Sequence, residues 1–181
     1  MDVHRYRLRV ASARSRNTGL SLIELILALS LLSILTGVGI PAFNNLIDRV
    51  RFDTDIAAVR SALSFARMTA VTRNERVVVC RWNGIDGCTG NRARGAYQWI
   101  HGLAVFNDLN YNKTLDEPSE SVIRIIPLSR LTNVIWSKGE VVAFNNNGNA
   151  PGYNGTFTVD VGQHSAKLIL SMTGRLRYDG H

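Results

Sequence analysis

A long apolar segment near the N-terminus constrains this chain more than any other feature. Residues 20–40 read LSLIELILALSLLSILTGVGI and contain one charged residue, Glu24. As a helix, this segment would be about 32 Å long at about 1.5 Å per residue, close to the hydrocarbon core of about 30 Å. We therefore expect residues 20–40 to form a single transmembrane helix.

The residues before this segment are strongly basic. Five of the first 19 residues are arginines and one is acidic, so more than half of the formal net charge of +7 lies there. The positive-inside rule places this end in the cytoplasm and the residues after Pro41 on the other side of the membrane. A secretory signal peptide is the alternative, but its apolar core spans about 7–15 residues and ends at a small-residue cleavage site. The carboxylate of Glu24 inside the apolar segment fits neither a signal peptide nor a plain anchor.

The start of the apolar segment resembles the class III signal of type IV pilins and pseudopilins. It reads Arg16-Asn17-Thr18-Gly19-Leu20-Ser21-Leu22-Ile23-Glu24-Leu25. The resemblance implies that a prepilin peptidase cuts between Gly19 and Leu20 and methylates the new N-terminus. Glu24 then becomes the fifth mature residue, where the family has its glutamate, and Pro41 falls where the family has a helix-kinking proline. Leu20 and Ser21 depart mildly from the family, in which Phe or Met and then Thr are commoner.

Cleavage would give Glu24 a chemical role. The new amine of Leu20 is a cation, and Glu24 of a neighbouring subunit could neutralise it in a pair that selects register more than it adds stability. The alternative is an acid solvated at the membrane interface.

An amphipathic helix is expected to continue over residues 41–74. Its apolar residues recur at intervals of three and four, at Ile56, Val59, Leu63, Ala66 and Ala70. Arginines lie between or beside them, at Arg49, Arg51, Arg60, Arg67 and Arg73. This pattern favours a helix packed on a sheet with its arginines in solvent; a DNA-binding stripe on the helix is the alternative. Asn74 is expected to end the helix.

Short segments rich in β-branched and aromatic residues follow Asn74, at residues 76–82, 96–106, 121–128, 133–137, 141–144, 156–161 and 167–171. A long helix followed by about seven strands predicts an α+β fold with an antiparallel sheet packed on the helix. Residues 61–70, 77–80 and 99–110 resemble the GspH/FimT family of minor pilins and pseudopilins. The resemblance implies a type IV pilin fold, with a leader at residues 1–19 and a periplasmic head at residues 75–181.

Two cysteines, Cys80 and Cys88, flank the sequence RWNGIDG. Both would lie outside the cytoplasm, where disulfides persist, and the glycine turns between them can bring the ends together. A disulfide is therefore expected, with two free thiols as the alternative. A zinc site would need two further ligands, and none is placed nearby.

The segment from Asp108 to Asp116 carries oxygen-bearing side chains at alternate positions, like the start of a calcium loop. An EF-hand loop would need Gly at Lys113 and Glu at Ser119, and this sequence has neither. A polar hairpin loop is the favoured interpretation, and calcium binding is the alternative.

The sequence Gly174-Arg175-Leu176-Arg177 lies near the C-terminus. In an extended chain Arg175 and Arg177 share one face, and two guanidiniums so placed can bridge successive phosphates. The sequence resembles the G-R-x-R motif of DNA-binding FimT-type pilins, which implies DNA contact through Gly174, Arg175 and Arg177. The alternative is an exposed pair of arginines at the end of a sheet.

No catalytic constellation, phosphate-binding glycine loop or paired buried carboxylates can be recognised, so the sequence predicts a protein that is not an enzyme and needs no cofactor. We expect a minor pilin held in the inner membrane before assembly. Its partners would be other pilin or pseudopilin subunits, prepilin peptidase and DNA taken up in transformation. The alternative is a type II secretion pseudopilin, or a structural minor pilin that primes assembly without binding DNA.

Overall fold

The computed structural model describes residues 19, 21–90, 92 and 94–180. Within them it forms one helix, α1 (Leu22–Arg73), and nine strands: β1 (Val77–Arg81), β2 (Tyr97–Gln98), β3 (Gly102–Asn107), β4 (Val122–Pro127), β5 (Asn133–Trp136), β6 (Val141–Phe144), β7 (Gly155–Val161), β8 (His164–Leu170) and β9 (Leu176–Gly180). The chain divides into two compact units, Met1–Pro41 and Ala42–His181, and we call the second unit the head.

The first unit contains the apolar part of α1. Ten large apolar side chains between Leu22 and Leu35 are exposed on it. We expected residues 20–40 to cross a membrane. In the part of the chain that the structure describes, no helix is long and apolar enough for such a crossing. The expected leader, apart from Gly19, and Leu20 lie outside the described residues.

In the head, α1 ends where the sequence predicts. Asn74 has a left-handed φ of 55°, and the amide of Glu75 donates to the carbonyl of Ala70 at 3.2 Å. This is the hydrogen bond of a Schellman motif, in which an Asn tolerates the left-handed position that closes the helix. The chain then turns directly into β1.

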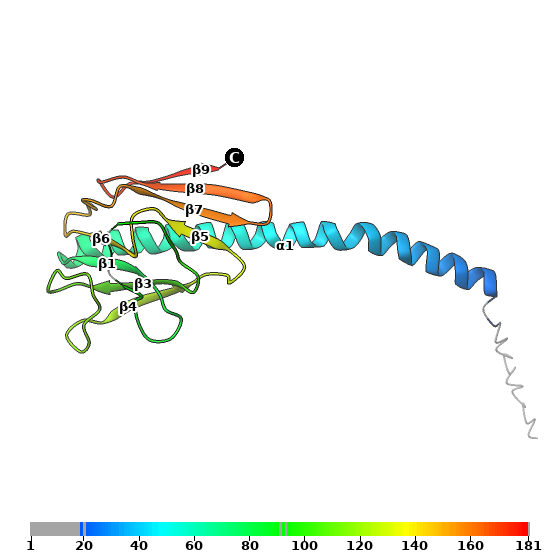
Figure 1. The fold of residues 1–181 in the computed structure, drawn as a ribbon, viewed down its shortest axis with the longest axis horizontal. Coiled ribbons are helices and arrows are strands. Elements are labelled where there is room, and N and C mark those ends of the chain that lie inside the picture. The colour runs from blue at the N-terminus through cyan, green and yellow to red at the C-terminus, as the bar shows by residue number, and fades with distance from the viewer. Residues whose placement is uncertain (1–18, 20, 91, 93, 181) are drawn as a thin grey trace, which may run out of the picture. The chain divides into compact units, whose positions relative to one another are not determined.

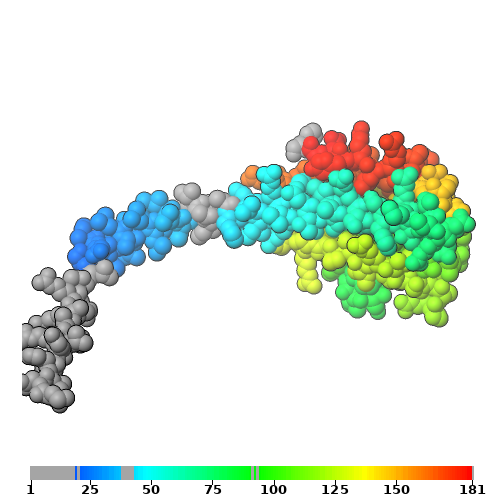
Figure 2. Space-filling model, turned by 180° about the vertical axis from the view of Figure 1, so that it is seen from behind, coloured from blue at the N-terminus to red at the C-terminus, as the bar shows by residue number. Residues whose placement is uncertain are grey.

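Two antiparallel sheets form the rest of the head. One has the strand order β4-β3-β1-β6 and the other the order β2-β5-β7-β8-β9. In Figures 1 and 2 the C-terminal strands lie along one side of the head part of α1, and Figure 1 shows β3 and β4 of the four-stranded sheet on the other side. The β7, β8 and β9 strands are consecutive antiparallel neighbours, so β9 forms an edge of the five-stranded sheet.

The core lies wholly within the head. The five apolar positions of the predicted helix stripe are all buried, as are nearly all residues of β1, β3 and β6. Strands β7 and β8 instead alternate, with Phe157, Val159, Leu168 and Leu170 buried and the residues between them more exposed. Phe157 joins the core rings, since it stacks on Trp136 at 4.3 Å and meets Trp99 edge-on at 5.3 Å. The alternation shows that one face of the five-stranded sheet is covered and the other faces solvent.

Three details differ from the sequence-based expectation. Residues 96–106 form two strands in different sheets. Strand β2 ends at Gln98 in the five-stranded sheet, and β3 begins in the four-stranded sheet at Gly102, whose φ is 143°. A Cβ at Gly102 would lie 2.5 Å from the carbonyl oxygen of Ile126, so only glycine fits this close approach of β3 to β4. The second difference is that the strands form two sheets rather than one, and the third is that residues after Gly174 form a further strand, β9.

Candidate nucleic-acid interface

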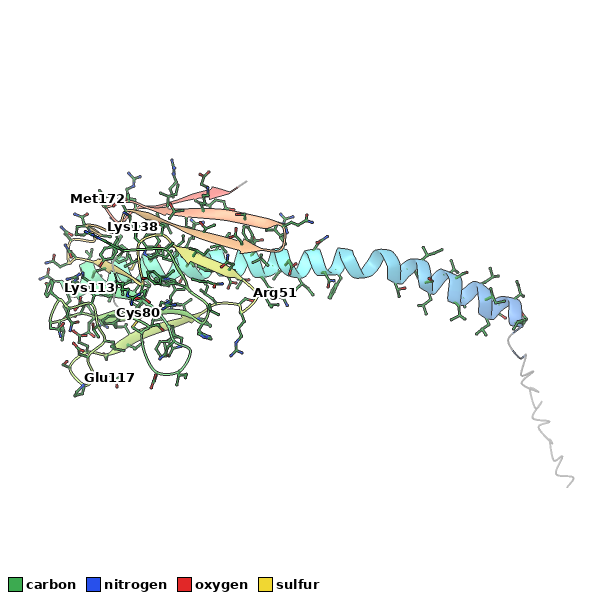
Figure 3. All side chains as sticks on the ribbon, in the orientation of Figure 1. Arg51, Cys80, Lys113, Glu117, Lys138 and Met172 are labelled. Carbon is green, nitrogen blue, oxygen red and sulfur yellow. A yellow bond between two sulfur atoms is a disulfide. The ribbon has the colours of Figure 1, made fainter. Side chains whose placement is uncertain are left out.

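The C-terminal hairpin of β8 and β9 carries the predicted arginine pair. Its loop, residues 171–175, is closed by hydrogen bonds from the amide of Gly174 to the carbonyl of Ser171 and from the amide of Ser171 to the carbonyl of Arg175, both at 2.9 Å. The Ser171 hydroxyl also accepts from the amide of Arg175 at 3.1 Å and lies 2.9 Å from the Thr173 hydroxyl. Met172 lies at the tip of this hairpin (Figure 3). The backbone leading to the arginine pair is therefore fixed by the loop itself.

Gly174 has a structural reason to be glycine. Its φ is 72°, and a Cβ there would collide with the carbonyl oxygen of Gly148 and lie 3.1 Å from Nε of Arg67. The amide of Ala150 donates to the carbonyl of Met172 at 2.8 Å and holds the two loops together. Gly174 thus lets the hairpin pack against the neighbouring loop, which is a positioning role.

Arg175 and Arg177 are both exposed, and they line the same surface hollow of about 530 Å³. Ser171, Thr173, Ile169 and Leu176 line it as well. Among the described residues neither guanidinium has an ion-pair partner within 4.0 Å. The structure therefore brings together the two arginines that the sequence predicts to share a face, and it adds two hydroxyl groups that the sequence analysis missed.

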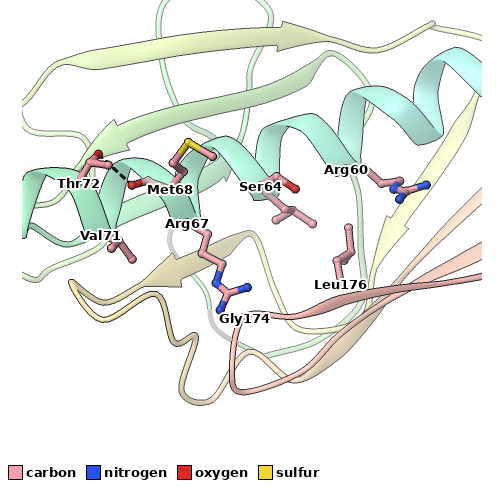
Figure 4. A pocket seen from close by; sticks show the side chains of 9 residues that line it. Arg60, Ser64, Arg67, Met68, Val71, Thr72, Gly174 and Leu176 are labelled. Carbon is pink, nitrogen blue, oxygen red and sulfur yellow. Dashed lines mark hydrogen bonds between the residues drawn. The ribbon is translucent and has the colours of Figure 1, made fainter.

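A different groove lies on the other side of the hairpin. It has a volume of about 500 Å³ and is lined by α1 residues facing Gly174 and Leu176 (Figure 4). Leu63, Met68 and Val71 are apolar residues of its lining, and Arg60 and Arg67 line it as well. Nε of Arg67 donates to the carbonyl of Gly148 at 3.1 Å. The arginines expected to be solvated on the helix thus include one that ties α1 to a loop.

The residues of the predicted processing site lie on the first unit. Gly19 is exposed, and a Cβ there would meet nothing within 4 Å. The hydroxyl of Ser21 accepts a hydrogen bond from the amide of Glu24 at 3.3 Å. This is half of an S-x-x-E capping box, which the sequence Ser21-Leu22-Ile23-Glu24 already contains. Glu24 is exposed, and Pro41 lies within α1.

Cys80 and Cys88 are joined by a disulfide, with their Cα atoms 5.7 Å apart. Cys80 is buried on β1, and Cys88 pairs with Trp82 in an isolated antiparallel bridge. Asn83 organises the loop between them, because its Oδ1 accepts from the amides of Ile85, Asp86 and Gly87 at 2.8–3.1 Å. The disulfide therefore closes a loop with its own internal hydrogen bonds.

The loop that resembles a calcium site uses its oxygens internally. Asp108 is buried beside Nε of Arg76 at 3.3 Å and accepts from the amide of Lys113 at 3.2 Å. Glu120 is also buried and accepts from the amides of Leu109 and Asp116. Among the described residues, no group of three or more His, Cys, Asp or Glu side chains has the arrangement to hold a metal ion.

The carboxyl groups of this loop are perturbed in opposite directions. Burial raises the pKa of Asp108 above its ordinary value of 3.8, although the amide of Lys113 and the charge of Arg76 act the other way. Hydrogen bonds from the side chains of Asn110 and Asn112 lower the pKa of Asp116 below 3.8. The two shifts follow from the burial of Asp108 and from the side-chain hydrogen bonds of Asp116 within the loop.

Comparisons with known proteins place this fold in a family. A family model described as Type II transport protein GspH matches residues 55–174, and a model of the prokaryotic N-terminal methylation motif matches residues 14–40. Two crystal forms of the type IV minor pilin FimU from Pseudomonas aeruginosa PAO1 are similar at 17% identity, with TM-scores of 0.49 and 0.48. The first match covers 70% of this chain and 88% of the FimU chain, and the second covers 69% of this chain and 91% of the FimU chain. No curated protein matches.

The GspH model covers 120 of the 181 residues and ends at Gly174, directly before the arginine pair. The methylation motif contains Gly19, Leu20 and Glu24. From these two matches, the chain belongs to the GspH family of minor type IV pilins and pseudopilins.

Proposed function

We propose that this protein is a minor pilin of FimT type that binds DNA for uptake, after processing and assembly into a pilus. The N-terminal part of the proposal is cleavage between Gly19 and Leu20 by prepilin peptidase. Residues 20–40 then hold the chain in the inner membrane, with the amphipathic helix of residues 41–74 and the periplasmic β-rich residues 75–181 beyond them. The methylation-motif match over residues 14–40 and the ten exposed apolar side chains of α1 support this arrangement.

Packing against other subunits would bury the ten exposed apolar side chains of α1. Such side chains are stable in lipid or against other apolar helices, and unfavourable in water. Glu24 has no ion-pair partner among the described residues, so its carboxylate is available to the N-terminal amine that cleavage creates on a neighbouring subunit. This pairing would set the register of the assembled helices.

Mass spectrometry of protein from cells that contain prepilin peptidase tests the processing step. The mature chain should begin at Leu20 and carry an N-methyl group. Gly19→Val should leave the precursor uncut, because a branched side chain crowds the scissile bond. A mature terminus elsewhere, for example after Gly39, would refute the processing proposal.

The observation that carries DNA binding is the shared hollow of Arg175 and Arg177. Both guanidiniums are exposed, no described acid neutralises either one, and the Ser171 and Thr173 hydroxyls lie in the same hollow. Guanidinium and hydroxyl groups are common donors to phosphate oxygens. Such contacts carry no base information, so we expect binding without strong sequence preference.

Fluorescence anisotropy of a labelled DNA duplex, titrated with the full-length protein in mild detergent, tests this proposal. Replacing Arg175 and Arg177 together by Gln should weaken binding and leave the melting temperature nearly unchanged, since exposed arginines contribute little to stability. Arg124→Gln is the control, because Arg124 is an exposed arginine on β4 that lies over the ring of Phe65. Wild-type affinity in the double variant, or equal losses in both proteins, would overturn DNA binding by the hairpin.

The second candidate function is that of a pseudopilin in type II secretion, which the match to the type II transport protein GspH family favours. In that case, or for a purely structural minor pilin, the hairpin arginines would be the polar end of a sheet. Neighbouring genes for pilus and competence proteins would support the first function, and a secretion operon would support the second.

A further inference from the structure

The strand register defines which residues of the C-terminal sheet face solvent together. We call the solvent-facing side of the five-stranded sheet the outer face. The residues of β7 and β8 on this face alternate with buried ones, and those of β9 are assigned to it by their cross-strand pairing with Ile169 and Lys167. The outer face of these strands carries Thr156, Thr158, Asp160, Ser165, Lys167, Ile169, Arg177 and Asp179. The hollow of the arginine pair opens on this face, since Ile169 and Arg177 both line it.

We propose that duplex DNA lies on the β8–β9 edge of this outer face, with Lys167 as a third phosphate contact and Asp179 as an acid that limits affinity. This inference rests on the proposed DNA-binding function and adds the path of the DNA. It assigns two residues that the G-R-x-R motif does not contain.

Lys167 is placed beside the arginine pair by register. Arg177 pairs with Ile169, and Asp179 pairs with Lys167. Residues two apart on a strand are separated by about 6.8 Å, and diagonal neighbours on adjacent strands by about 7–8 Å. Lys167 is therefore a same-face neighbour of Arg177, and it is exposed. Arg175, Arg177 and Lys167 together make a short basic row at the sheet edge.

Asp179 stands at the end of that row. It is exposed and directly opposite Lys167, but no salt bridge within 4.0 Å joins these two side chains. A phosphate approaching Lys167 would meet the negative charge of Asp179 next to it. Like charges held close together disfavour binding, so the acid should weaken the DNA complex.

The chemistry of the outer face favours a duplex over a single strand. Non-specific single-strand sites stack bases on aromatic side chains, and none of the outer-face residues of β7 to β9 is aromatic. Tyr178 belongs to the other side, because it pairs with the buried Leu168. Cationic and hydroxyl groups without a stacking platform suit a duplex, which presents its phosphates and keeps its bases stacked.

The groove on the opposite side of the hairpin is the competing location. Its apolar lining residues are Leu63, Met68, Val71 and Leu176, and Arg67 is already hydrogen-bonded to Gly148. A phosphate backbone would gain little from these apolar side chains. Arg60 flanks the groove, is exposed and belongs to the other side of the hairpin, so it is a matched control.

Anisotropy titrations of full-length protein in mild detergent, with a labelled 20-base-pair duplex, test the placement. Asp179→Asn should tighten binding and Lys167→Gln should weaken it, each about two- to fivefold, the range of one exposed charge interaction. Arg60→Gln should bind as wild type. The slope of log K against log salt should shrink by about 0.9 in Lys167→Gln and stay unchanged in Asp179→Asn, because only the lysine contacts a phosphate.

The outcomes separate this inference from the function on which it rests. A gain of affinity in Asp179→Asn supports the placement, and damage to the fold cannot produce it. If the arginine double variant loses binding while Lys167→Gln and Asp179→Asn bind as wild type, the placement is wrong and DNA binding stands. A loss in Arg60→Gln matching that in Lys167→Gln, or tighter binding of a single strand of the same length than of the duplex, would also overturn the placement. Absence of DNA binding by the wild type would overturn both proposals.

Discussion

Replacing Gly174 by Ala should destabilise the head by a predictable amount. The left-handed φ of 72° costs an alanine about 1–2 kcal/mol. The added Cβ would collide with the carbonyl oxygen of Gly148, so the two loops must move apart, at a further cost of about 1–3 kcal/mol. The sum is about 2–5 kcal/mol, which lowers the melting temperature of a unit of this size by about 6–15 °C.

Gly152→Ala is the matched control for this experiment. Gly152 also has a positive φ, 84°, but a Cβ there would meet nothing within 4 Å. This variant therefore incurs only the backbone cost. Circular dichroism melts of the two variants and the wild type, as isolated heads under oxidising conditions, measure the difference. If Gly174→Ala melts no lower than Gly152→Ala, the close packing of the hairpin on the Gly148 loop does not constrain residue 174, and our reasoning about this glycine is refuted.

Two further measurements address the loops of the head. Cys80→Ser should lower stability by about 2.5 kcal/mol, the loop-closure value for so short a ring, and labelling of both cysteines in the periplasmic wild type without reductant would contradict the disulfide. In carboxyl NMR titrations Asp116 should titrate below 3.8 and Asp108 above it, and the reverse order would refute the loop geometry. By linkage, the lowered pKa of Asp116 stabilises the fold at pH values above its unfolded pKa, and this contribution is lost as the pH falls through its folded pKa. The raised pKa of Asp108 acts in the opposite direction. Its contribution to the free energy of unfolding declines as the pH rises from 3.8 through its folded pKa.

The sequence predicts the parts of the fold that depend on local pattern. The helix stripe from Ile56 to Ala70 is buried as its periodicity predicts, and Asn74 ends the helix because a left-handed residue is needed there. The disulfide also follows from a short spacing with turns between the cysteines. In each case the signal that predicts the feature is local in the sequence, although the stripe is buried by packing on distant strands.

Features that depend on distant contacts were not predictable in the same way. The break between β2 and β3 arises because Gly102 packs against the backbone of β4, and strand β9 exists because β8 offers an unpaired edge. The requirement for Gly174 comes from Gly148, 26 residues earlier in the chain. The arginine pair itself was predictable, because alternation in an extended segment is a local property. The hydroxyls of Ser171 and Thr173 and the neighbouring Lys167 were not, since they join the site through the hairpin.

The salt dependence of DNA binding tests the central claim most directly. With wild-type protein, the logarithm of the association constant should fall linearly with the logarithm of salt concentration, and each neutralised phosphate contributes about −0.9 to the slope. Replacing Arg175 and Arg177 by Gln should make the slope shallower by about 1.8 if each contacts one phosphate. A double variant with the wild-type slope, or a wild-type protein whose binding does not depend on salt, would contradict the account.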